Sequence, residues 1–172
     1  DIDQYVTSGS HITEQLLQFA KGNQWQVRPT DMNALIDTSA RMFGRTKKGI
    51  KIMMKPRKNL WAAEVNKEQI ERVLLNLYVN AVDAMPEGGK LTLKASPDAK
   101  KGLLEIKVED TGTGISREDL QNIFDPFYTT KIMGKSGTGL GLSIVHGIVN
   151  NHKGKITVDS DAGKGTVVTI TI

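Results

Sequence analysis

Asn76-Leu77-Tyr78-Val79-Asn80-Ala81 opens a series of four short stretches that decide the fold of this chain. It is followed by Asp110-Thr111-Gly112-Thr113-Gly114, by Phe124-Asp125-Pro126-Phe127 and by Gly137-Thr138-Gly139-Leu140-Gly141-Leu142. Each stretch alone is weak evidence, because turns and helix ends use the same residues. Their succession is hard to explain by packing, and it indicates a nucleotide site.

The composition limits the classes of protein to consider. With 172 residues, the chain is long enough for one domain with a proper core and marginal for two. It has no cysteine, which excludes disulfides and thiolate metal sites. The net charge of +4 suits a polyphosphate ligand and is too small to indicate nucleic-acid binding.

The ends and hydropathy of the chain predict a cytoplasmic fragment. No apolar run approaches the roughly 20 residues that a membrane-spanning helix needs. The chain begins at Asp1 without a signal-like segment, so we interpret it as a piece of a longer protein. Any membrane association is then expected only through regions absent from this chain.

The hydrophobic periodicity predicts an α/β domain with a mixed sheet covered on one face by helices. Helices are expected over 1–22, 31–43, 68–85 and 140–151, with a short one near 116–122. Strands are expected over 50–55, 60–65, 90–95, 103–110, 155–160 and 166–172. The second of these is joined to the first by the turn-forming residues 56–59, and Gly154 is expected as a left-handed cap after the last helix.

The helix over 68–85 is apolar around most of its circumference and carries one polar stripe. The stripe consists of Gln69, Arg72, Asn76, Asn80 and Asp83, at steps of three and four. A solvent-facing stripe is the ordinary explanation, but asparagine is a mediocre helix former. Asn80 offers an amide oxygen that suits Mg²⁺, and Asp83 could hold a metal-bound water.

Asp110 ends an expected strand and precedes two glycines. Gly112 and Gly114 would let the backbone turn sharply and approach a flat ligand. A carboxylate in such a pocket can accept a hydrogen bond from the exocyclic amine of adenine, whereas guanine presents a carbonyl there. A simple strand-to-helix turn remains the alternative for this stretch alone.

The glycines at 137, 139 and 141 precede an expected helix, whose free N–H groups and dipole favour phosphate. Two familiar nucleotide motifs do not fit. A Walker loop ending at Gly134-Lys135-Ser136 would need glycine where Thr129 stands, and a dinucleotide fingerprint starting at Gly139 would need a small residue where Ile144 stands.

Residues 125–138 are predicted to form a mobile connection that orders around a triphosphate, because they carry glycines and lysines but few apolar anchors. Lys131 and Lys135 could reach a terminal phosphate as point charges. Phe124 and Phe127 are expected to anchor the connection onto the core. His146 and His152 are expected to be structural.

The four stretches closely resemble the N, G1, F and G2 boxes of histidine-kinase catalytic domains. The resemblance covers 23–172 and extends to Asp83-Ala84-Met85-Pro86-Glu87-Gly88-Gly89, which looks like the nitrogen-regulator and sensory-box branch. It implies the α/β sandwich shared with gyrase B, the large heat-shock chaperones and mismatch-repair ATPases. Residues 1–22 resemble the second helix of the dimerisation and phosphoacceptor domain, and the helix with the phosphorylated histidine is absent, so His11 is not expected to replace it.

The resemblance also implies a set of site residues for ATP and Mg²⁺. Asn80 would bind Mg²⁺, Asp110 the adenine, and Asn76, Asn80 and Lys131 would serve the reaction. The implied nucleotide contacts are Asn80, Asp83, Asp110, Gly112, Gly114, Ile115, Phe127, Thr130, Lys131, Gly137, Thr138, Gly139, Leu140, Gly141 and Leu142. One departure is Asp83, where many membrane-bound sensor kinases carry a lysine.

The residue at position 76 helps to distinguish transfer of the γ-phosphate from hydrolysis of ATP among proteins of this fold. Hydrolytic relatives place a glutamate one turn before the metal-binding asparagine, and here that position is Asn76. The resemblance therefore implies transfer of the γ-phosphate to a histidine outside this chain and onward to the receiver domain of a response regulator. The full-length protein is expected to form a homodimer through its dimerisation helices. A hydrolytic ATPase and a non-catalytic nucleotide-binding module remain the alternatives.

Overall fold

The computed structural model describes residues 26–44, 49–98, 101–130 and 138–172. The expected helix over 1–22 lies outside these residues. The helices are α2 (Met32–Gly44), α3 (Lys67–Asp83), the short 3-10 helix η1 (Asp119–Gln121) and α4 (Gly141–Asn151). The strands are β1 (Arg28–Thr30), β2 (Ile50–Lys55), β3 (Ala63–Val65), β4 (Gly89–Asp98), β5 (Leu103–Asp110), β6 (Lys155–Asp161) and β7 (Gly165–Thr171).

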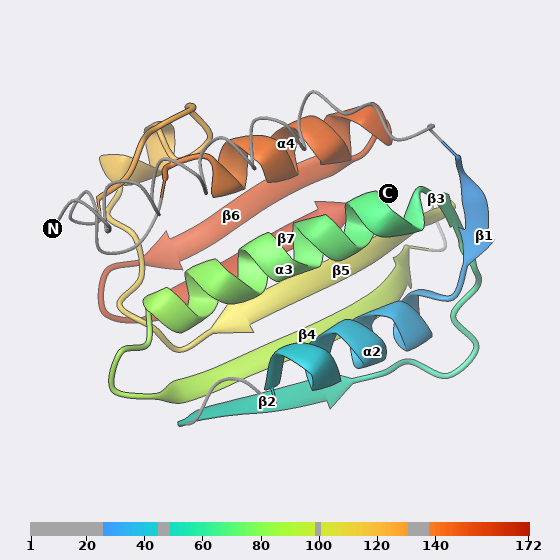
Figure 1. Ribbon diagram of the computed structural model, residues 1–172, viewed down its shortest axis with the longest axis horizontal. Helices are drawn as coiled ribbons and strands as arrows, with labels where there is room; N and C mark the ends of the chain where they lie inside the picture. The colour runs from blue at the N-terminus through green and yellow to red at the C-terminus, as the bar shows by residue number, and fades with distance from the viewer. Residues whose placement is uncertain (1–25, 45–48, 99–100, 131–137) are drawn as a thin grey trace, which may run out of the picture.

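A five-stranded sheet forms one layer of the molecule, in the order β2-β4-β5-β7-β6. β2 pairs with β4 in parallel, and the other neighbours are antiparallel. The helices α2, α3 and α4 lie side by side across one face of this sheet (Figure 1). The predicted two-layer α/β fold with a mixed sheet is confirmed.

The core lies between the helices and the sheet. Its most buried large side chains include Tyr78 and Leu74 on α3 and Leu91, Leu93 and Ile106 on the facing strands. Alternate residues of β5 are buried, so this strand turns its other side chains to the face without helices. The helix α3 occupies the centre of the layer (Figure 1) and contacts both α4 and β5.

The helix α3 begins and ends close to the predicted positions for identifiable reasons. Asn66 is its N-cap, and its side-chain oxygen accepts a hydrogen bond from the backbone N–H of Gln69 at 3.0 Å. Ala84 is the C-cap, and Pro86 follows shortly after. None of the described helices is long and apolar enough to cross a membrane.

The two strands expected over 50–55 and 60–65 do not pair with each other. The first forms as predicted, but it pairs in parallel with β4. The second is reduced to Ala63–Val65 and pairs with β1, a strand that the sequence did not predict, in a separate two-stranded sheet. A turn signal fixes where a strand ends, whereas tertiary packing decides its partner.

The predicted cap at Gly154 is wrong. Lys153 is the residue in the left-handed conformation, with φ of 56°. Gly154 is needed for a different reason, because a Cβ there would lie 2.5 Å from the carbonyl oxygen of Thr171. The end of α4 therefore packs directly on the backbone of β7.

His152 joins the end of α4 to the start of α3. Its Nε2 accepts a hydrogen bond from the backbone N–H of Asn66 at 3.0 Å, and its Nδ1 lies 2.8 Å from the carbonyl oxygen of Ile148. Asn66 is only 3% exposed, so no water can replace the imidazole as its acceptor without rearrangement. The two bonds fix the tautomer of the ring, with the proton on Nδ1.

We expect His152→Ala to lower the free energy of unfolding by roughly 1–3 kcal/mol, because it leaves the buried N–H of Asn66 unpaired. Urea denaturation monitored by circular dichroism measures this change. The control is Asn151→Ala, an exposed neighbour at the end of the same helix, for which a change within about 0.5 kcal/mol is expected. Equal effects of the two substitutions would show that the imidazole is not a structural link.

Candidate functional site

A cavity of about 510 Å³ lies between α3, the end of β5 and the start of α4. Most of the residues predicted to form the site line it: Asn76, Asn80, Asp83, Asp110, Gly114, Ile115, Thr130, Thr138, Gly139, Gly141 and Leu142. Residues from segments far apart in the sequence therefore line one cavity.

Five of the residues predicted to form the site are not among those that line the cavity. Leu140 is buried in the hydrophobic core, and Gly112 lies beneath the cavity against the end of α3. Phe127 does not line the cavity. Lys131 and Gly137 lie outside the described residues, as does Lys135.

Asp110 lies at the end of β5 and is 9% exposed. Burial raises the pKa of its carboxyl group, although hydrogen bonds from the backbone N–H groups of Gly112 and Thr166 act in the opposite direction. The bond from Gly112 to one carboxylate oxygen measures 2.8 Å. These bonds hold the group in place, and the carboxylate lines the cavity as a hydrogen-bond acceptor.

The loop after Asp110 is fixed on both sides by backbone contacts. The N–H of Thr113 donates to the carbonyl oxygen of Ala84 at the end of α3, and its own carbonyl accepts from Gly163 in the β6–β7 turn. Gly114 has a φ of +68°, and a Cβ at this position would lie 2.0 Å from the carbonyl oxygen of Asp161. Only glycine fits both the conformation and the space, so the loop is set rigidly at the cavity wall.

Ser160 and Thr166 continue this support. The hydroxyl of Ser160 accepts a hydrogen bond from the N–H of Ile115 at 2.9 Å and donates to the carbonyl oxygen of Gly165 at 2.8 Å. It also lies 3.0 Å from the hydroxyl of Thr166. Thr166 is the residue of β7 that pairs with Asp110 of β5 in the sheet. Thr166 itself lines the cavity.

The two asparagines of α3 face the first turn of α4. The side-chain amide of Asn76 donates to the carbonyl oxygen of Arg72 at 2.8 Å, which leaves its Oδ1 directed toward Gly141. A Cβ on Gly141 would lie 3.2 Å from that oxygen and within 4 Å of the amide of Asn80. Gly141 thus keeps the space between the helices open for a ligand.

The N-terminus of α4 has no side-chain cap. Its N-cap residue is Leu140, whose side chain cannot accept a hydrogen bond. The first N–H groups of the helix and its dipole therefore favour an anion at this point of the cavity.

Phe127 and Gly139 lie at the two ends of the segment that contains the undescribed residues 131–137. The N–H of Phe127 donates to the carbonyl oxygen of Gly139 at 3.0 Å, and the two residues have φ values of 67° and 69°. The side chain of Phe127 is 61% exposed, so the prediction that it anchors the segment onto the core is wrong. Phe124 is half-buried and contacts His146 on α4, with the two ring centroids 5.1 Å apart.

Asp119 and Tyr128 form a further contact at the cavity wall. The hydroxyl of Tyr128 donates to one carboxylate oxygen of Asp119 at 2.5 Å, and the hydroxyl of Ser116 donates to the other at 2.7 Å. Both bonds lower the pKa of Asp119, and the bond to Asp119 raises the pKa of Tyr128. The N–H of Asp119 donates to the hydroxyl of Ser116 at 3.1 Å, although the short helix η1 begins at Asp119 with Glu118 as its N-cap.

The sequence did not single out Thr113, Asp119, Tyr128 or Thr166 as lining residues. The position of these residues in the cavity depends on strand pairing and on a side-chain hydrogen bond between two loops. Neither can be predicted from the spacing of residues in the sequence.

The described residues contain no cluster of three or more His, Asp or Glu side chains that could hold a metal ion. What the cavity offers is the amide oxygens of Asn76 and Asn80, which are hard ligands of the type that Mg²⁺ accepts. Two such oxygens fit an ion that arrives with phosphate oxygens and water, and do not form a complete site of their own.

Comparison with known proteins agrees with this geometry. Residues 65–172 match the family model of histidine kinase-, DNA gyrase B- and HSP90-like ATPases. The sensor kinase CckA of Brucella abortus is 38% identical over 99% of this chain and 19% of its own length. Among solved structures, full-length ShkA in complex with AMPPNP has a TM-score of 0.82 and 27% identity, covering 96% of this chain and 36% of that one.

A second solved structure includes a partner protein. The histidine kinase ThkA in complex with the response regulator TrrA matches with a TM-score of 0.80 and 26% identity, over 99% of this chain and 48% of that one. The chain spans about a fifth of the length of CckA and less than half of the chains in these two structures.

This chain belongs to the family of histidine kinase-, DNA gyrase B- and HSP90-like ATPases. Its relatives are sensor kinases, and the expected likeness to histidine-kinase catalytic domains is confirmed.

Proposed function

We propose that this chain is the ATP-binding catalytic domain of a sensor histidine kinase, which transfers the γ-phosphate of Mg-ATP to a histidine outside the chain. One observation carries the proposal. A buried carboxylate, two asparagine amides and an uncapped helix N-terminus line one cavity, which supports sites for a base, a metal ion and phosphates.

Asp110 selects the base. Its carboxylate accepts a hydrogen bond from the exocyclic amine of adenine, and it repels the carbonyl that guanine presents at the same edge. Val108, Ile123, Val158 and Val168 line the same cavity and supply an apolar surface for the ring. Gly114 and Thr166 complete the wall beside the carboxylate.

The phosphates lie at the first turn of α4, where free backbone N–H groups and the helix dipole meet the negative charge. Thr130 and Thr138 line this region and can donate hydroxyl hydrogen bonds. Lys131 and Gly137, which the sequence assigns to the phosphates, remain predictions because they lie outside the described residues.

Asn80 and Asn76 would hold Mg²⁺ together with phosphate oxygens and water, and Asp83 would orient a bound water. The bound ion would neutralise the charge of the phosphates. Asn80 and Asn76 themselves orient the triphosphate, which supports transfer because this chemistry depends on positioning and charge neutralisation.

Asn76 favours transfer over hydrolysis. An amide has no basic lone pair to activate water, and the nitrogen of this one is already bound to the carbonyl oxygen of Arg72. Phosphoryl transfer to a separate histidine needs no such base on this chain. The partners would be a phosphoacceptor domain that dimerises in the full-length protein and then the receiver domain of a response regulator.

The decisive experiment supplies the missing acceptor. We expect the isolated chain to bind radiolabelled ATP but to acquire no label itself. A separately purified dimerisation domain with its histidine should become labelled, though slowly, because the two parts are not tethered. The control is the same acceptor domain with its histidine replaced by glutamine.

Two outcomes would contradict the proposal. Label on His11 of this chain would require residues 1–22 to be the acceptor helix. Steady release of free phosphate faster than transfer would favour a hydrolytic ATPase of the same fold.

A further inference from the structure

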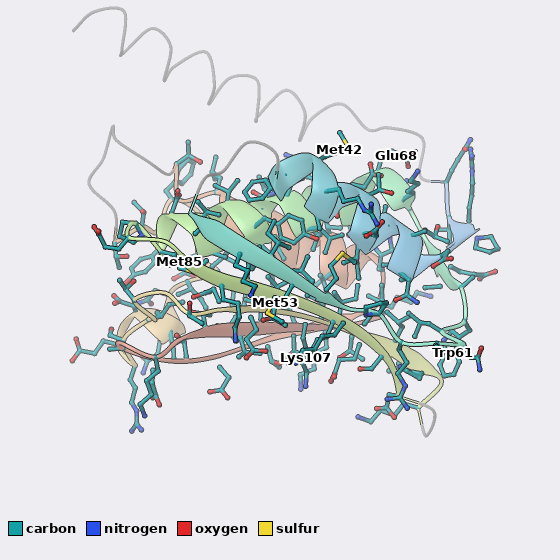
Figure 2. The ribbon with its side chains drawn as sticks, turned by 90° about the horizontal axis from the view of Figure 1, so that it is seen from below. Met42, Met53, Trp61, Glu68, Met85 and Lys107 are labelled. Carbon is teal, nitrogen blue, oxygen red and sulfur yellow. The ribbon has the colours of Figure 1, made fainter. Side chains whose placement is uncertain are left out.

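The sheet face opposite the helices carries a concentration of lysines on two adjacent strands. Figure 2 shows this face beneath the sheet, with Met53 and Lys107 pointing away from the helices. On β2, Ile50, Ile52 and Met54 pack against the core, so Lys51, Met53 and Lys55 point the other way. On β4, Leu91, Leu93 and Ala95 are buried, so Lys90 and Lys94 share that open face.

The strand register places these lysines directly opposite one another. Lys51 is paired with Lys90 and Lys55 with Lys94 in the parallel β2–β4 ladder. Lys94 is also opposite Lys107 on β5. Like charges in directly opposed positions destabilise a sheet, so the fold gains nothing from this arrangement.

Local acids compensate only part of this charge. Lys94 forms an ion pair with Glu109 at 2.7 Å, and Lys107 pairs with Glu105 at 3.1 Å. Lys94, Lys90 and Lys55 together hold the pKa of Glu109 below its usual range. Within the described residues, no ion pair involves Lys51, Lys55 or Lys90.

Protection of a sheet edge explains only half of the cluster. Lysines on an exposed edge strand prevent edge-to-edge aggregation, and β2 is an edge strand. β4 is an interior strand with neighbours on both sides, so Lys90 and Lys94 have no such role. The four residues Lys51, Lys55, Lys90 and Lys94 are called the lysine face below.

We propose that the lysine face binds the surface of an anionic phospholipid membrane. Lysine is a point charge without the planar fork of arginine, so it suits a diffuse field of negative headgroups more than one shaped ligand. Protein interfaces are depleted in lysine at their centres, which argues against a protein partner for the lysine face.

Two neighbouring features fit the same partner. Arg57 and Lys58 follow Pro56 shortly after the end of β2 and are exposed. Trp61, which is 41% exposed, lies at the far end of the sheet in Figure 2, and tryptophan favours the headgroup region of membranes. The sequence alone predicted membrane association only through regions absent from this chain. It could not show that Lys51 and Lys90 lie on one face of the sheet, because that depends on strand pairing.

The test measures sedimentation of the 172-residue chain with vesicles. We expect binding to vesicles that contain phosphatidylserine and none to pure phosphatidylcholine, and the binding should weaken as salt rises. Each lysine near an anionic surface contributes about fivefold, so Lys51→Gln with Lys90→Gln should reduce partitioning by about 25-fold. ATP binding by this double variant should stay unchanged, which shows that it is folded.

The matched control removes the same two charges from the helix layer, as Arg41→Gln with Lys67→Gln. We expect it to change partitioning by less than about twofold, because these residues do not lie on the lysine face. An equal loss in both double variants would mean that only net charge matters, and it would overturn the proposal. The absence of vesicle binding would also overturn the proposal. The same holds if Lys51→Gln with Lys90→Gln reduces binding to duplex DNA and leaves binding to vesicles unchanged.

Discussion

Asn80→Ala is expected to abolish phosphoryl transfer to a separately supplied acceptor domain. The substitution removes the amide oxygen that the proposed site offers to Mg²⁺. Loss of even an outer-shell partner of a metal ligand costs about 10–100-fold, so loss of a ligand should cost at least about 100-fold. Incorporation of radiolabel into the acceptor domain measures the effect.

The fold should tolerate this change. Asn80 lines the cavity and is not among the residues of the core cluster, and alanine is the better helix former by up to about 0.7 kcal/mol. Glu71→Ala, on the same helix but away from the cavity, serves as the control and should leave transfer unchanged. Wild-type transfer by Asn80→Ala in a folded chain would remove Asn80 from the site.

Asp110→Asn should weaken ATP binding and erase the preference for adenine. The change replaces an acceptor by a group that can also donate, so it competes with the amine of the base. We expect a loss of roughly 1–3 kcal/mol in the free energy of ATP binding. Because burial already raises the pKa of Asp110, a neutral side chain should be accepted at this position without loss of the fold.

The neighbouring residue provides a matched control. Glu109→Gln removes one negative charge from the adjacent position of β5, but Glu109 points to the sheet face opposite the helices and pairs with Lys94. Its ATP affinity should equal that of the wild type. If both substitutions weaken ATP to the same extent, the effect is one of net charge and not of a contact to adenine.

The sequence predicted the elements that carry strong local signals. β2 and β5 have the predicted bounds, and α3 differs by one or two residues at its ends because capping residues and proline mark them. The resemblance also indicated which residues would come together, and Asn76, Asn80 and Asp83 of the polar stripe line one cavity with Gly139 and Gly141.

Long-range pairing was beyond these local signals. β3 pairs with β1 and β2 with β4, although a turn joins the expected strands over 50–55 and 60–65. The exposure of Phe127 and the left-handed Lys153 also escaped prediction, since hydrophobicity favours burial of the first and glycine was the expected residue for the second. The opposed lysines follow from register alone.

Calorimetric titration of the wild-type chain with ATP and with GTP, each in the presence of Mg²⁺, tests the central claim most directly. The arrangement of Asp110 in the cavity predicts clear heat of binding for ATP and an affinity for GTP that is weaker by at least about tenfold, the lower end of the contribution expected from one hydrogen bond to a charged group. Equal affinities for the two nucleotides, or no binding of ATP, would contradict the assignment of this cavity as an adenine nucleotide site.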